Sequence, residues 1–189
     1  MPSLFALKEQ NSSSLYRLMY GLFYPAVLGA IFYEVLPHIL DFQGIGFVKE
    51  LLAILIVIHF SIDYATVGGA KEYGLLPFIC DLLVICALYF AFSQVHISHS
   101  EGVSIVGVSL GLAAVYCAFL FFLFSMRRVL SHKILFLIVE SLGMLWFLAV
   151  AWWWPNAWML VAGLALFSVI VGYTANKAVQ RIAEKSGSR

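Results

Sequence analysis

The chain has 189 residues, of which 63% are hydrophobic and only 11% are charged. Soluble domains are roughly half apolar and about one quarter charged, so this composition excludes an ordinary soluble domain and predicts an integral membrane protein. The formal net charge of +1 excludes nucleic acid as the main partner, because such binding requires a strongly basic surface.

Six apolar stretches of membrane-spanning length are separated by short polar breaks. A transmembrane helix needs about 20 apolar residues, and short breaks make consecutive helices antiparallel neighbours. We therefore expect an all-α bundle of six transmembrane helices over residues 15–176, after a short N-terminal segment (1–14) and before a basic tail (177–189). The expected helices lie near Leu18–Leu40, Gly46–Val67, Tyr73–Phe92, Val103–Phe124, Ile134–Trp154 and Ala157–Tyr173.

The distribution of basic residues predicts the orientation of the bundle. If the N-terminus is cytoplasmic, ten of the eleven Lys and Arg residues lie on the cytoplasmic side, and only Lys49 lies outside. Cytoplasmic loops carry such an excess of basic residues, and Trp is enriched at membrane interfaces. We therefore expect both termini in the cytoplasm, in a bacterial inner membrane, and an outer interface that contains Trp152, Trp153, Trp154 and Trp158.

The first predicted helix contains Pro25 and ends with Glu34 and His38, four residues apart on one helical face. His96 and His99 follow the third helix and lie on the same outer side. Histidine titrates near neutral pH and binds metals as the neutral ring. These four residues are a candidate outer pH or metal site, and the alternative is a set of solvent-exposed polar residues.

Four ionisable residues inside the second, third and fifth predicted helices form the candidate ion or proton path: His59, Asp63, Asp81 and Glu140. His59 and Asp63 are four residues apart and share a face. A charge at the bilayer centre is costly, so such residues usually face the bundle interior or a wet cavity. With alternating helix directions, the three acids lie in the cytoplasmic half and could form one site. The alternative for Asp63 and Asp81 is snorkelling to the interface.

The fourth predicted helix contains Gly107 and Gly111 in a GxxxG pattern. Small residues at this spacing let helix backbones approach closely. We expect this face to pack against another helix, either within the chain or between copies in a homo-oligomer.

Basic residues on the cytoplasmic side form two groups. The pair Arg127 and Arg128 follows the fourth helix, and basic residues recur every four positions in the tail. This pattern indicates docking to anionic lipid or to a soluble cytoplasmic protein. The tail residues are Lys177, Arg181, Lys185 and Arg189.

No motif in the chain specifies a reaction. We find no phosphate-binding glycine loop, no HExxH and no nucleophile elbow, so we expect no cofactor and rank an enzyme third. The buried acids favour a proton or small-cation conduit. The basic rim favours a non-catalytic anchor or sensor subunit that recruits a soluble effector, for example in a stress or phage response.

Overall fold

The computed structural model describes residues 14–35, 45–67, 73–96, 104–125 and 133–187, and the regular structure of these residues is helical. A helical turn at 14–18 leads into the π-helix η1 (Met19–Phe23), which continues directly into α2 (Tyr24–Val35). The remaining helices are α3 (Ile45–Val67), α4 (Leu75–His96), α5 (Ile105–Ser125), α6 (Lys133–Trp152) and α7 (Ala157–Gly187). The predicted all-helical class is confirmed.

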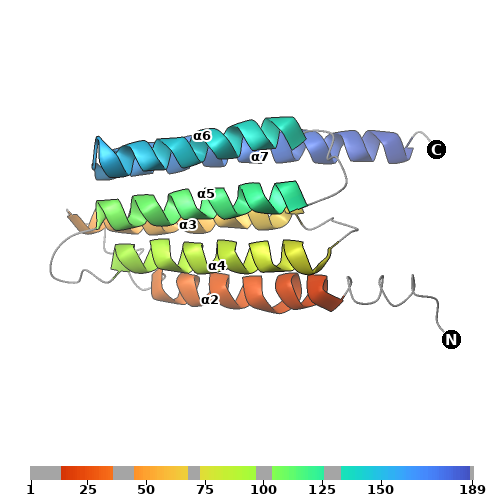
Figure 1. The fold of residues 1–189 in the computed structure, drawn as a ribbon, viewed down its shortest axis with the longest axis horizontal. Helices are drawn as coiled ribbons and strands as arrows, with labels where there is room; N and C mark the ends of the chain where they lie inside the picture. Colours follow the sequence, from red (N-terminus) through yellow and green to blue (C-terminus); the bar gives the residue numbers. More distant parts are fainter. Residues whose placement is uncertain (1–13, 36–44, 68–72, 97–103, 126–132, 188–189) are drawn as a thin grey trace.

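In Figure 1, α4, α5 and α6 lie side by side, with α3 behind α5 and α7 behind α6. The first helix, α2, lies beside α4 and contacts both α3 and α4. Consecutive helices run in opposite directions, whereas α3 and α7 lie side by side and run in the same direction. The start of the first helix and the end of α7 are therefore at the same end of the bundle.

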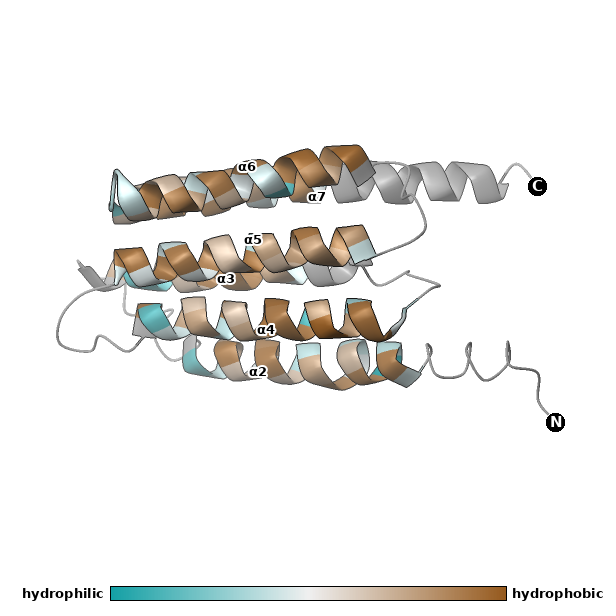
Figure 2. Cartoon of the chain, in the orientation of Figure 1, coloured by the Kyte–Doolittle hydropathy of each residue, from teal (hydrophilic) through white to brown (hydrophobic). Residues whose placement is uncertain are grey.

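Within the described part of the chain, four helical segments are long and apolar enough to cross a membrane: Ser14–Glu34, Leu75–Val95, Ile105–Ser125 and Ile134–Trp152. Ala157–Tyr173, at the start of α7, is a shorter apolar helix. Figure 2 shows that hydrophobic residues, in brown, run along most of the helices. Many large apolar side chains, such as Phe121 and Val169, are exposed on the surface of the bundle. Lipid is the solvent that such a surface requires, so the chain is a membrane protein.

Several helix boundaries differ from the predicted ones. The first helix begins at Ser14 rather than Leu18, and α4 begins at Leu75, so Tyr73 precedes it. At the last hairpin, α6 ends at Trp152. There the Asn156 side chain accepts a hydrogen bond from the backbone N–H of Trp158 at 2.8 Å, which is the capping contact that begins a helix.

The π-turn of η1 lies directly before Pro25. Proline has no N–H to donate to the preceding turn, and its ring crowds the carbonyl four residues earlier. In the wider turn, Tyr24 donates its backbone N–H to the carbonyl of Met19, five residues earlier. In a wider turn, residues four positions apart lie more nearly above one another along the helix axis. The rings of Tyr20 and Tyr24, four positions apart, are stacked with their centroids 5.0 Å apart.

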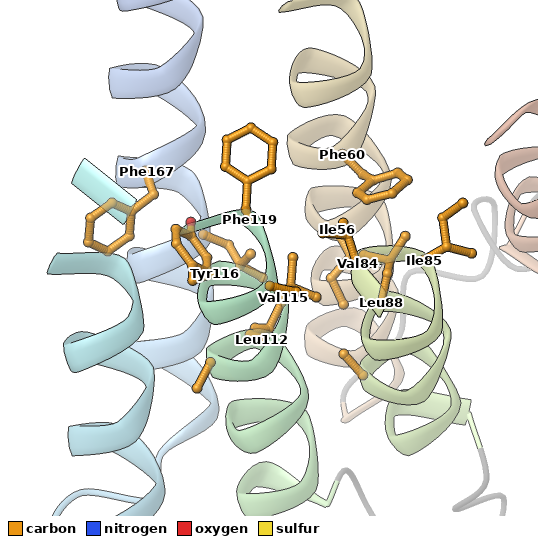
Figure 3. Packing of buried hydrophobic residues seen from close by; sticks show 14 of the residues in the cluster. Ile56, Phe60, Val84, Ile85, Leu88, Leu112, Val115, Tyr116, Phe119 and Phe167 are labelled. Carbon is orange, nitrogen blue, oxygen red and sulfur yellow. The ribbon is translucent and has the colours of Figure 1, made fainter. Parts of the chain in front are cut away.

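The buried core contains residues from every helix that the structure describes. Figure 3 shows Ile56 and Phe60 of α3 packed with Leu88 of α4 and with Leu112 and Val115 of α5. Close approach of α4 and α5 depends on small residues. A Cβ atom added to Gly111 would lie 2.7 Å from the Cα atom of Ala91, so this part of the GxxxG face packs within the chain.

Candidate functional site

Asp81 is fully buried near the start of α4 and has three tyrosine partners. The hydroxyl of Tyr20 donates to Oδ2 at 3.0 Å, and the hydroxyl of Tyr24 donates to Oδ1 at 3.5 Å. Tyr73, which precedes α4, also donates to Oδ2. We call these four residues the Asp81 cluster. Its carboxyl group lies about 9 Å along the helix from Leu75, in the half of the bundle that also contains the start of the first helix.

Aromatic rings surround the Asp81 cluster. Tyr16 is stacked on Tyr20 at 4.7 Å, and Tyr24 is stacked on Phe60 of α3 at 5.1 Å. The ring of Tyr73 meets that of Tyr20 edge to face at 5.8 Å. Stacked and edge-to-face pairs stabilise packing beyond simple area burial. These rings exclude water from the carboxyl group and leave the phenol oxygens as its polar neighbours.

A second polar group lies deeper in the bundle, around His59. Its Nδ1 atom is 3.0 Å from the Ser168 hydroxyl of α7, and its Nε2 atom is 3.1 Å from the Tyr116 hydroxyl of α5. All three side chains are buried. We call them the His59 cluster. A neutral imidazole donates a hydrogen bond from one nitrogen and accepts one at the other. One of the two hydroxyls can therefore accept from the ring while the other donates to it.

Small and aromatic residues determine where Tyr116 lies. A Cβ atom added to Gly143 of α6 would lie 2.2 Å from a ring carbon of Tyr116, so the ring fits only because residue 143 has no side chain. Phe147 and Phe167 pack against the same ring, with centroids 5.4 and 5.7 Å away. The hydroxyl is thereby held toward His59.

The four residues of the predicted ion or proton path have the following positions in the structure. Glu140 is 1% exposed on α6, Asp81 is 0% exposed on α4, and His59 is 3% exposed on α3. Asp63 belongs to the helical backbone of α3, but its side chain lies outside the described part of the structure. The hydrogen bonds described above give Asp81 and His59 different partners, so these two residues belong to separate clusters here. Among the described residues, no three His, Cys, Asp or Glu side chains could hold a metal ion together.

The other predicted site residues are only partly described. Glu34 is exposed on α2. For His96 and the tail residues Lys177, Arg181 and Lys185, the structure describes a helical backbone only. The remaining predicted residues lie outside the described ranges: His38, His99, Arg127, Arg128 and Arg189.

Sequence reasoning missed the hydroxyl partners of both clusters. Tyr16, Tyr20 and Tyr24 recur at intervals of four, which is a helical stripe that could have been recognised. No pattern in the sequence connects Ser168 to His59, which lies 109 positions earlier.

No known family model, curated protein or solved structure matches this chain. The fold and the two clusters define the class to which it belongs, a helical membrane protein with buried ionisable groups in one half of its bundle. Its function therefore has to be argued from these residues.

Proposed function

We propose that the chain is a six-span protein of a bacterial inner membrane, with both termini in the cytoplasm, that conducts protons or small cations. Its path would use the Asp81 cluster, the His59 cluster and Glu140, with Asp63 as a further member. The basic residues on one side of the six predicted spans support this orientation. In this orientation the Asp81 cluster is on the cytoplasmic side.

The observation that carries the proposal is the hydroxyl group at each ring nitrogen of His59. Imidazole can accept a proton at one nitrogen and release a proton from the other, which makes histidine a proton shuttle. Ser168 and Tyr116 are at hydrogen-bond distance from the two nitrogens. The cluster thus joins α7, α3 and α5 by groups that can exchange protons.

The depth of the charged groups supports the same conclusion. Carboxyl groups inside a membrane are costly and are usually retained on substrate, ion or proton pathways. Asp81 and Glu140 are each within about 11 Å of the helix end on the proposed cytoplasmic side. His59 lies about 12 Å from the end of α3. The polar groups therefore extend from the proposed cytoplasmic side toward the middle of the bundle.

The test is ion flux into liposomes that contain the purified chain. We expect an imposed pH gradient to drive proton flux in the wild type. Tyr116→Phe and Asp81→Asn should reduce the flux on the order of tenfold or more, because each removes a proton-exchanging group while keeping the shape of the side chain. Glu50→Gln is the matched control, since Glu50 is a partly buried acid near the start of α3, at the opposite end of the bundle.

A wild type without flux of protons or cations would refute the proposal. Unchanged flux in both Tyr116→Phe and Asp81→Asn would show that neither cluster takes part in conduction. Thermal unfolding of each variant in detergent distinguishes lost function from lost folding. Glu140→Gln tests the remaining buried acid in the same assay.

The second candidate function is an anchor or sensor subunit that recruits a soluble cytoplasmic protein. It is favoured by α7, whose helical backbone continues from Tyr173 to Gly187 and projects past the other helices (Figure 1). Basic residues four positions apart share one face of such an extension. The test compares the proteins that co-purify from membranes with the full chain and with a chain that ends at Lys177. If both chains recover the same proteins, the tail does not recruit them.

A further inference from the structure

We propose that the Asp81 cluster binds a single small monovalent cation, of the size of Na⁺. Five oxygen atoms converge there: both carboxylate oxygens of Asp81 and the phenol oxygens of Tyr20, Tyr24 and Tyr73. They come from the first helix, from the segment before α4 and from α4 itself. This inference deepens the proposed function by naming the ion at Asp81, and it rests on that function for its role in transport.

The ligand atoms select the chemical class of the ion. Oxygen ligands suit hard cations, whereas transition metals favour imidazole or thiolate ligands. Each phenol now donates its hydrogen to the carboxylate. Rotation of the O–H bond would turn the hydrogen away and present an oxygen lone pair to a cation, without moving the ring.

The charge of the cluster selects the valence of the ion. One carboxylate supplies a single negative charge, and phenols are neutral, since their ordinary pKa is about 10. A monovalent cation would make the buried group neutral, whereas a divalent cation would leave a net charge in a low-dielectric interior, at high cost. Asp81 is fully buried, so neutrality is the state that this site favours.

The spacing of the oxygens favours a small ion. The phenol oxygens of Tyr20 and Tyr24 are 3.0 and 3.5 Å from the carboxylate oxygens that accept their hydrogen bonds. The stacked rings of Tyr16, Tyr20, Tyr24 and Phe60 limit how far the cluster can expand. A snug fit of the oxygen ligands is one proposed basis for discrimination between Na⁺ and K⁺, and closely spaced oxygens fit the smaller ion.

The test is thermal unfolding of the purified full chain in detergent, in NaCl and in equal concentrations of KCl and choline chloride. A ligand that binds only the folded state raises its stability in proportion to the logarithm of ligand concentration above Kd. We expect NaCl to raise the Tm of the wild type by about 2 to 8 °C over choline chloride. Asp81→Asn should abolish this shift, and Glu50→Gln should keep it.

Tyr24→Phe provides the second variant, because it keeps the stacked ring and removes one oxygen. We expect it to shift the Na⁺ concentration needed for half of the effect upward by about tenfold, even where Asp81→Asn fails to fold. Equal Tm values for the wild type in all three salts, or an undiminished Na⁺ shift in Asp81→Asn, would overturn the inference. A Na⁺ shift without ion flux would instead refute the proposed conduit and leave the binding site in place.

Discussion

At the scale of the residue, Tyr116 has two separate roles at one point of the bundle. Its ring occupies the space left open by Gly143, and its hydroxyl meets Nε2 of His59 at 3.1 Å. Packing of the ring determines where the hydroxyl lies, and the hydroxyl in turn orients the imidazole. Phenylalanine at this position would keep the first role and lose the second.

We expect Tyr116→Phe to lower the free energy of unfolding by about 1 to 3 kcal/mol. Removing one partner leaves the other buried polar group without that hydrogen bond, and the cost is its desolvation. Tyr89→Phe on α4 is the matched control, because Tyr89 is 54% exposed on the apolar surface. The measurement is equilibrium unfolding in mixed detergent micelles, and equal losses in the two variants would show that the His59 contact contributes nothing.

At the scale of the element, the contact between α4 and α5 depends on the absence of side-chain atoms. A Cβ atom at Gly107 would lie 2.5 Å from the side-chain oxygen of Gln94, and one at Gly111 would lie 2.7 Å from the backbone of Ala91. A flexible glutamine can move aside, whereas a helix backbone cannot. Of the two glycines, Gly111 is therefore the one that limits more strictly how α4 and α5 can pack.

We expect Gly111→Ala to destabilise the fold by about 1 to 3 kcal/mol, the usual cost of overpacking. Gly29→Ala on α2 is the control, since no atom lies within 4 Å of its added Cβ, and alanine there should be neutral or stabilising by up to about 1 kcal/mol. Thermal unfolding of both variants in the same detergent makes the comparison. A Gly111→Ala variant as stable as the wild type would mean that α4 and α5 can separate without cost.

At the scale of the whole molecule, the antiparallel order of the helices places both clusters in the same half of the bundle. Asp81 is near the start of α4, whereas His59 is in the second half of α3. Because α3 and α4 run in opposite directions (Figure 1), these two positions lie toward the same end. Whether that end faces the cytoplasm depends on the proposed orientation.

Orientation can be tested by labelling single cysteines with a membrane-impermeant maleimide, after alanine replaces Cys80, Cys86 and Cys117. We expect Ser98→Cys to react in intact cells and Ser131→Cys to react only after permeabilisation, because the excess of basic residues retains the second loop in the cytoplasm. The reverse labelling pattern would show that the orientation in the membrane is opposite to the proposed one. Labelling of both positions in intact cells would contradict a six-span topology.

Part of the candidate site could be predicted from the sequence. Asp81, Glu140 and His59 stand out because ionisable residues inside apolar stretches are rare, and the structure buries all three. The expected union of the three acids Asp63, Asp81 and Glu140 into one site remains a prediction, because the side chain of Asp63 lies outside the described residues. The partners of Asp81 and His59 are hydroxyl groups, which are common in membrane helices. Apart from the spacing of Tyr20 and Tyr24, they carry no comparable signal.

Composition and the length of the apolar stretches are enough to predict that this protein requires lipid and that its regular structure is helical. A backbone inside a bilayer must satisfy its own hydrogen bonds, and apolar stretches of about 20 residues do so as helices that span the membrane. Which polar groups meet depends on the tertiary fold. Tyr20 reaches Asp81 across 61 positions, and Ser168 reaches His59 across 109. These contacts depend on the rotation of each helix about its axis, which packing between helices determines and local sequence does not.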